Sequence, residues 1–573
     1  MFLPTTPQEC AELGWQTLDV IIVSGDSYID TPFSGTAVIG KVLTAAGFRV
    51  GVIAQPKIDT AEDITRLGEP ALFWGVTGGV VDSMVANYTA ARKRRHSDDN
   101  TPGGVNDRRP DRAAIAYTNL IRRFYKNTRP IVLGGIEASL RRVAHYDFWS
   151  DRVRGSILLD AKADLLFYGM AEKGVVELAN ALRDGQDYRD IRGLCYLERQ
   201  PRAGYLELPA YEVVASDKAA FTAMFHTFYQ NNDPITARGL VQRHGDRYLI
   251  QNPPALTPSQ AELDAVYSLG FERAQHPYYE RQGKVKALET IQFSIQTHRG
   301  CYGECNFCAI AVHEGRTVAW RSPDSIVHEV EGLAVMPSFK GNIQDVGGPT
   351  ANMYGFECAK KLKSGACAKK RCLYPEICNQ MKVNHSQQIE LLQRLSRVKG
   401  VRKVFVASGI RYDMVLADPN HGRNYLRQVV HHHVSGQMKI APEHTENKVL
   451  RLMGKPGNDS LLRFKGMFEQ MSAEAGKPQF LTYYLIAAHP GCSEDDMRRL
   501  RTFTSQKLNI HPEQVQIFTP TPSTYSSLMY YTETDPFTGE KLFVEKETGR
   551  KERQKRIVVE KETPPARRRS HGQ

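Results

Sequence analysis

The sequence predicts an α/β protein in which an N-terminal doubly wound parallel sheet is followed by a partial (β/α)6 barrel. Two series of short apolar strands alternate with helix-like segments, and glycines follow many of the strands. Such alternation is typical of parallel sheets covered by helices. A chain of 573 residues is long enough for several domains. We expect domains over 1–215 and 290–535, a connector over 216–289, and a C-terminal hairpin with a basic disordered tail over 536–573.

The first series is expected to build the N-terminal sheet. Its predicted strands are apolar runs over 18–25, 48–56, 71–79, 129–135 and 163–169. Ligands of such sheets bind at the carboxyl ends of the strands. No G-x-G-x-x-G motif opens a helix in this region, which argues against a nicotinamide cofactor.

Three charged residues follow strands of this sheet: Glu137, Arg141 and Glu172. Two interpretations stay open, namely side chains that face a ligand cleft and ordinary surface charges.

The second series is expected to form the barrel. Its predicted strands cover 291–296, 342–348, 402–409, 437–444, 480–491 and 515–522. Helices are predicted between them. Ser322 and Pro323 supply a cap and a first-turn proline, and Ser493 with Asp496 resembles a capping box. In barrels of this kind, the chemistry lies on the loops that follow the strands.

Three cysteines follow the first strand of the second series: Cys301, Cys305 and Cys308. Thiolates are soft ligands that suit zinc and iron–sulfur clusters. Three of them can hold three corners of a cubane and leave one iron without a protein ligand, and open positions are where metals do chemistry. The alternative is a zinc half-site at Cys305-x2-Cys308 that distant cysteines complete.

The spacing Cys-x3-Cys-x2-Cys resembles the radical SAM superfamily. The resemblance implies a [4Fe–4S] cluster on these three thiolates and S-adenosylmethionine (SAM) on the open iron. One electron from the cluster would cleave SAM and generate a 5′-deoxyadenosyl radical that abstracts hydrogen from a substrate. It also implies that Phe307 lies near the adenine.

Further SAM contacts are expected at later strand ends. Gly347 and Gly348 resemble the Gly-Gly-Glu motif that receives the SAM amino group, but Pro349 stands in the third position. Ser408 and Arg411 are placed to bind the ribose and the carboxylate, because guanidinium pairs well with carboxylates. The alternatives are a tight turn at the two glycines and a surface ion pair at Arg411.

Longer motifs resemble the YgiQ family of radical SAM proteins over about residues 15–545. They include RGCYGECNFCAIAVHEGR, FKGNIQDVGGPTANMYG, MKIAPEHT and FTPTPSTYSSLMYYT. The resemblance implies the fold and cofactors and leaves the substrate unassigned: RNA, a peptide or a metabolite. A reducing partner such as flavodoxin or ferredoxin is expected. The basic tail differs from the C-terminal region of that family.

A second cysteine group lies in an insert over 352–380: Cys358, Cys367, Cys372 and Cys378. Four thiols suit an auxiliary iron–sulfur cluster, a structural zinc site, or reduced cysteines without a ligand, and all three interpretations stay open. Surrounding lysines are expected to lower the pKa values of these thiols.

The N-terminal sheet also resembles the cobalamin-binding-like domain that precedes many radical SAM barrels. The Asp-x-His-x-x-Gly loop that supplies a histidine to cobalt is absent from this chain, which argues against cobalamin.

Charge and hydropathy limit the partners. Of the net charge of +12, nine charges lie in 92–112 and 548–573, which we expect to be a solvated loop and tail. The remainder is near neutral, which disfavours strong nucleic-acid affinity, although the basic segments leave RNA contact open. Neither a secretory signal nor a membrane span is expected, so a cytoplasmic protein is predicted. The rival function is a non-catalytic iron–sulfur or zinc binding or sensor protein.

Overall fold

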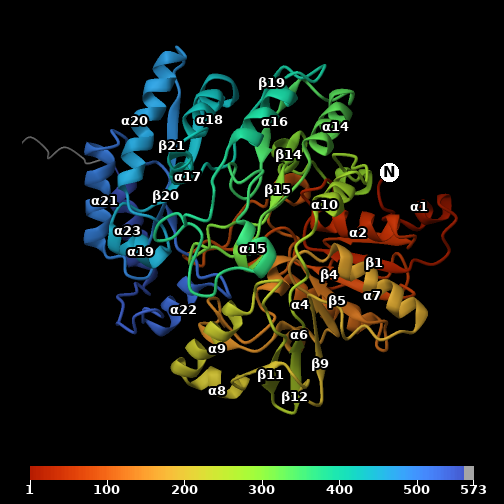
Figure 1. The fold of residues 1–573 in the computed structure, drawn as a ribbon. Coiled ribbons are helices and arrows are strands. Elements are labelled where there is room, and N and C mark those ends of the chain that lie inside the picture. The colour runs from red at the N-terminus through yellow and green to blue at the C-terminus, as the bar shows by residue number, and fades with distance from the viewer. Residues whose placement is uncertain (561–573) are drawn as a thin grey trace, which may run out of the picture.

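The computed structural model describes residues 1–560, and a nine-stranded sheet organises its N-terminal half (Figure 1). The strand order is β10-β11-β12-β9-β8-β5-β4-β1-β3, and the edge strand β10 covers Leu206–Leu208. Five consecutive strands at one side of this sheet pair in parallel: β3 (Val50–Ala54), β1 (Val20–Ser24), β4 (Phe73–Thr77), β5 (Ile131–Gly134) and β8 (Leu165–Phe167). Each lies inside a predicted strand, because these apolar runs are buried on both faces. The predicted α/β class with a large parallel sheet is confirmed.

Segment 216–289 differs from the irregular connector that we expected. It supplies strands β11 (Leu240–His244) and β12 (Arg247–Gln251), an antiparallel pair that joins the same sheet through β9 (Leu194–Glu198). Helix α9 (Lys218–Gln230) buries its aromatic side chains in the core of the N-terminal half. Polar residues among the apolar ones hid this hairpin in the sequence, although Leu240 and Leu249 pack into one core of the N-terminal half and Val241 and Ile250 into another.

Segment 92–112 is solvated only in part: residues 92–95 are exposed, as expected, but Arg109 is not. Arg109 is fully buried and forms ion pairs with Asp26 at 2.6 Å and Asp98 at 2.8 Å. Its charge is therefore neutralised inside the protein rather than hydrated, and it is not available to a nucleic acid.

In the C-terminal half, successive strands pair in parallel. β14 (Ser294–Gln296) pairs with β18 (Asp345–Gly347), and β17 (Asn342–Ile343) pairs with β19 (Lys403–Val404). A parallel bridge joins Ile410 to Ile440. The remaining pairs link β20 (Gln437–Glu443) to β21 (Phe480–Ala487) and β21 to β22 (Gln516–Ile517).

Helices lie around these strands on the outer side of the C-terminal half (Figure 1). They are α14 (Pro323–Ala334), α16 (Ser386–Ser396), α18 (Gly422–Gln428), α20 (Asp459–Glu474) and α21 (Glu494–Gln506). The predicted caps of two of them are confirmed. The Ser322 hydroxyl accepts a hydrogen bond from the Ser325 N–H at 3.1 Å, and Ser493 with Asp496 forms a capping box at the start of α21.

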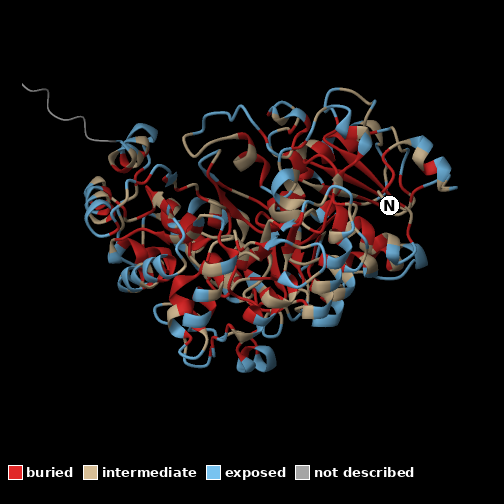
Figure 2. Cartoon of the chain, turned by 90° about the horizontal axis from the view of Figure 1, so that it is seen from above, coloured by how far each residue is buried: buried red, intermediate tan, exposed pale blue. Residues whose placement is uncertain are grey.

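Buried residues run through both halves of the molecule (Figure 2). The core of the N-terminal half includes aromatic residues of α22 (Tyr525–Thr532), which lies far along the chain. No helix in residues 1–560 has the length and apolarity needed to span a bilayer.

The C-terminal region only partly matches its prediction. An antiparallel bridge between Thr534 and Lys541 closes the expected hairpin. Residues 548–559, expected to be disordered, form helix α23 (Thr548–Val559), and Gln554 of this helix donates a hydrogen bond to the Cys492 carbonyl at 3.1 Å. Residues 561–573 of the predicted tail lie outside the described residues.

Candidate functional site

The three-cysteine loop begins where strand β15 (His298–Arg299) ends. The Gly303 N–H donates to Cys301 Sγ at 3.3 Å. A Cβ at position 303 would lie 3.2 Å from Cys301 Sγ and 3.6 Å from Cys305 Sγ. The chain therefore turns between two sulfurs at a residue without a side chain, which keeps the space beside them open.

The thiols lie close enough to influence one another. Burial raises the pKa of Cys301, and the neighbouring Cys305 raises it further. Burial likewise raises the pKa of Cys308, with added contributions from Cys305 and Cys301. Thiols that resist ionisation when metal-free release their protons on binding a cation, because the metal replaces the proton as the positive partner.

This loop fits an iron–sulfur cluster by its donor set, because three soft sulfurs gather in a partly open setting. Among residues 1–560, no three His, Cys, Asp or Glu side chains converge around a single metal ion. Cysteines of a cubane each bind a different iron, so convergence on one point is not what such a cluster requires.

Arg411 lies beside the cysteine loop rather than on the surface. Its guanidinium binds the Asp413 carboxylate through Nε at 2.9 Å and Nη2 at 2.5 Å, and Nη1 lies 3.8 Å from Cys305 Sγ. Burial opposes the charge, but Asp413 outweighs it and raises the pKa of Arg411. The interpretation of Arg411 as a surface ion pair is wrong, because the pair is buried.

Gly347 and Gly348 make close approaches that differ from a plain turn. The Gly347 carbonyl accepts hydrogen bonds from the Thr297 N–H at 2.7 Å and from its hydroxyl at 3.1 Å. A Cβ at Gly348 would lie 2.6 Å from Nε2 of the buried His298. The Gly347 carbonyl is thus already engaged by Thr297, while the backbone at Gly348 packs against an imidazole.

Ser408 lies next to this glycine pair. Its hydroxyl and its N–H both donate to the Asp345 carboxylate, the N–H at 3.0 Å. A Cβ at Gly347 would lie 3.3 Å from Ser408 Cβ. The structure therefore brings Ser408 and Gly347 together, as expected of neighbouring strand ends.

Phe307 lies where the two halves of the protein meet. It packs against the hydrophobic cores of both halves. Its ring makes an edge contact with buried His489, with ring centres 6.5 Å apart. His489 Nε2 is in turn 2.7 Å from the Ser526 hydroxyl.

Two charged residues near the cysteines, Glu443 and Lys455, were not predicted from the sequence. Glu443 ends β20 with a left-handed φ of 67°, and burial raises its pKa while Lys455 and Arg411 lower it. Lys455 is buried and donates to the Ala441 carbonyl at 2.6 Å. The position of Glu443 at a strand end in MKIAPEHT was a usable signal, whereas Lys455 comes near only through packing.

The second cysteine group is only partly brought together. Cys358, Cys372 and Cys378 belong to one small hydrophobic cluster that also contacts Cys301, whereas Cys367 is exposed. Lys361 Nζ lies 3.9 Å from Cys372 Sγ. Burial nevertheless raises the pKa of Cys372 to about 11. The expectation of lowered thiol pKa values is therefore wrong for Cys372, because desolvation outweighs the lysine.

The charged residues after the N-terminal strands have different roles. Glu137 is buried and accepts the N–H groups of Ser83 at 2.8 Å and Ala114 at 3.0 Å, and buried Arg141 pairs with Asp82. These two are structural and are not surface charges. Glu172 forms an ion pair with Arg299, two residues before the first cysteine of the loop.

Comparisons with known proteins place these features in context. Residues 2–294 match a family model described as Radical SAM N-terminal. A UPF0313 protein of Fusobacterium nucleatum is 59% identical over 561 residues, which cover 98% of this chain and 99% of that protein. A UPF0313 protein of Thermotoga maritima is 50% identical over 553 residues, covering 95% of this chain and 96% of that protein.

A solved structure shares the fold. The cobalamin-dependent S-adenosylmethionine radical enzyme OxsB with aqua-cobalamin bound superimposes with a TM-score of 0.50 and 11% identity. The match covers 90% of this chain and 56% of that one. At this identity the similarity concerns the fold alone.

Proposed function

The chain belongs to the UPF0313 family of radical SAM proteins, and on that premise we propose that it is a radical SAM enzyme whose Cys301, Cys305 and Cys308 hold a [4Fe–4S] cluster. The observation that carries the proposal is the gathering of these thiols with the Arg411 guanidinium, whose Nη1 lies 3.8 Å from Cys305 Sγ. When bound, such a cluster supplies the single electron for reductive cleavage of SAM, which initiates hydrogen abstraction from a substrate.

The residues around the loop are proposed to bind and orient SAM. We assign the Arg411 N–H that faces Cys305 to the SAM carboxylate, since Asp413 fixes the guanidinium plane. We assign the SAM amino group to the backbone of Gly348, which packs against His298, because the Gly347 carbonyl is already held by Thr297. Ser408, through Asp345, positions this strand end for the ribose, and Phe307 borders the adenine.

The parallel strand pairs from β14 to β22 are proposed to form the partial (β/α)6 barrel, with the site on the loops at their carboxyl ends. We also propose that Cys358, Cys372 and Cys378 hold a second metal centre, either an auxiliary iron–sulfur cluster or zinc. We propose no cobalamin, since the cobalt-binding histidine motif is absent from the sequence. A cytoplasmic location and a flavodoxin-like or ferredoxin-like electron donor complete the proposal.

The test is anaerobic reconstitution of the full chain, followed by iron and zinc counting and an assay of 5′-deoxyadenosine with dithionite and SAM. We expect about four irons per chain from the first site, and SAM cleavage that Cys301→Ala abolishes. Cys10→Ala is the matched control, because Cys10 lies in helix α1 (Pro7–Glu12), outside the loop. Zinc in place of iron, with no cleavage by any reductant, would instead support the non-catalytic binding or sensor protein.

A further inference from the structure

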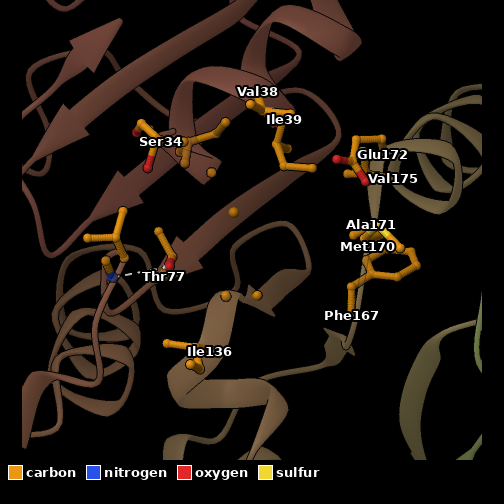
Figure 3. A pocket seen from close by; sticks show the side chains of 18 of the residues that line it. Ser34, Val38, Ile39, Thr77, Ile136, Phe167, Met170, Ala171, Glu172 and Val175 are labelled. Carbon is orange, nitrogen blue, oxygen red and sulfur yellow. Dashed lines mark hydrogen bonds between the residues drawn. The ribbon is translucent and has the colours of Figure 1, made fainter. Parts of the chain in front are cut away.

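A cavity of about 420 Å³ lies between the N-terminal sheet and two helices that cover it, α2 (Gly35–Ala45) and α7 (Glu172–Asp184). Figure 3 shows Val38 and Ile39 of α2 facing Phe167, Met170 and Val175 across this space. The volume is in the range of small-molecule sites, which are mostly apolar with a few placed polar groups.

The sequence keeps this space open with residues that lack side chains. A Cβ at Gly134, at the carboxyl end of β5, would meet no heavy atom within 4 Å. The same holds for Gly35 at the start of α2. Protein interiors are normally close-packed, and an apolar wall without a partner loses dispersion contacts. A space of this size is therefore better explained by an occupant than by loose packing.

The wall of the cavity includes both ends of the cysteine loop. Gln296 and Arg299 line it before Cys301, and Ile310, His313 and Glu314 line it after Cys308. The segment that carries the three thiols is therefore flanked on both sides by residues that line the cavity. A ligand in the cavity would lie against the backbone that supports the proposed cluster.

The charged side chains of the wall offer no free cation to an anion. Arg299 is the only lysine or arginine among the lining residues, and it is already paired with Glu172. Asp26 is paired with Arg109, and burial raises the pKa of Glu314. Burial lowers the pKa of His313 to about 4, so this imidazole is neutral at pH 7. A phosphate would find no free cation here.

We propose that this cavity binds the neutral, largely apolar body of the substrate, while the Glu172–Arg299 pair holds the polar end that faces the cysteine loop. The identification of the ligand as a substrate rests on the proposed radical SAM activity. The binding of a neutral ligand in this cavity does not depend on that activity. The assignment favours a small organic molecule, or an apolar group of a larger one, over a polyanion such as RNA.

The first test uses the full-length protein and a neutral fluorescent probe, N-phenyl-1-naphthylamine. We expect saturable binding at one site per chain, with blue-shifted emission. The sulfonate analogue 8-anilinonaphthalene-1-sulfonate is expected to bind at least tenfold more weakly. Equal or tighter binding of the sulfonate would overturn the neutral class of ligand. Displacement of the probe by hydroxocobalamin would overturn the assignment to a substrate.

Variants that fill the cavity test whether the probe binds inside it. Gly134→Leu is expected to weaken probe binding at least tenfold, and Ala171→Leu, from the same wall, provides a second variant if the first does not fold. Gly466→Leu is the matched control, because a Cβ on this exposed glycine of α20 also meets nothing within 4 Å. Unchanged probe affinity in a folded cavity variant would overturn the proposal. SAM cleavage is measured separately on the wild-type protein, so its failure leaves the probe result standing.

Discussion

Arg411 and Asp413 form a buried bidentate ion pair that leaves the Nη1 of the guanidinium directed at Cys305 Sγ, 3.8 Å away. The two residues are separated by one position in the sequence. Together they hold the guanidinium charge beside cysteine sulfurs that would be thiolates when they bind a metal. A lysine could not reproduce this arrangement, because it lacks the planar pair of donors.

Asp413→Asn tests this relationship. Removing one charge of a buried pair costs about 3–5 kcal/mol, so we expect a lower melting temperature. We also expect SAM binding to the reconstituted protein, measured by equilibrium dialysis, to weaken at least tenfold because the guanidinium loses its fixed plane. Asp495→Asn is the control, since Asp495 is an exposed partner of Arg498. Equal stability and SAM affinity in the two variants would contradict the role of the pair.

Single cysteine replacements distinguish the metal site of the loop from the second cysteine group. Cys301→Ser, Cys305→Ser and Cys308→Ser are each expected to remove the iron that depends on the loop, because each of the three irons held by the protein needs its thiolate. Cys367→Ser is expected to leave the metal content unchanged, since this exposed residue lies apart from Cys358, Cys372 and Cys378. Metal analysis after anaerobic reconstitution checks both results. Loss of iron in Cys367→Ser would place this residue in a metal site.

Alkylation rates report the burial of the thiols. In the metal-free native protein, we expect iodoacetamide to modify Cys367 first, because it is the exposed cysteine. Cys195 and Cys492 are expected to react last, since both side chains are fully buried and burial also raises the pKa of each thiol to about 12. Peptide mapping by mass spectrometry over time measures the order. Fast modification of Cys492 would show that its surroundings open in solution.

Gly348→Ala tests the close approach at the second strand end. Its Cβ would meet Nε2 of buried His298 at 2.6 Å, so we expect a lower melting temperature and weaker SAM binding. The double variant with His298→Ala is expected to recover part of the stability, because the clash is removed. Gly332→Ala, at an exposed position of α14, provides the control and is expected to stabilise the helix by about 0.5–1 kcal/mol. Additive effects in the double variant would argue against the contact.

His244→Phe tests the pH dependence of stability. Burial lowers the pKa of His244 to about 4, whereas an unfolded histidine titrates near 6.5. Between these values the unfolded chain binds more protons, so this residue's contribution to stability is complete above about pH 6.5 and is lost as the pH falls towards 4. The ring stacks on Tyr211, and neither of its nitrogens has a hydrogen-bond partner in the structure. Phe should therefore preserve the packing.

We expect the variant to melt at least as high as the wild type at pH 7.5 and to lose less stability on acidification to pH 5. Melting curves across this range measure the difference. Parallel pH profiles for the two proteins would show that His244 is protonated in the folded state or is not the residue that responds.

Much of the N-terminal sheet was readable from the sequence because its strands are buried on both faces. Continuous apolar runs such as that of β1 therefore marked them clearly. The hairpin of β11 and β12 was missed because a sheet edge mixes polar and apolar residues. Helix α23 was missed because its charged sequence carries few apolar residues, and it packs chiefly through contacts with α21 that lie far away in sequence.

The sequence by itself determined the family, the α/β class and the three-cysteine motif, since these depend on residue types at short spacings. Only the tertiary structure decided that Arg411 is turned towards Cys305, that Thr297 occupies the Gly347 carbonyl, and that Cys367 stands apart from its group. It also decided that the cavity wall and the cysteine loop share a backbone. Each of these depends on contacts between distant segments, which packing and burial set and which no local spacing encodes.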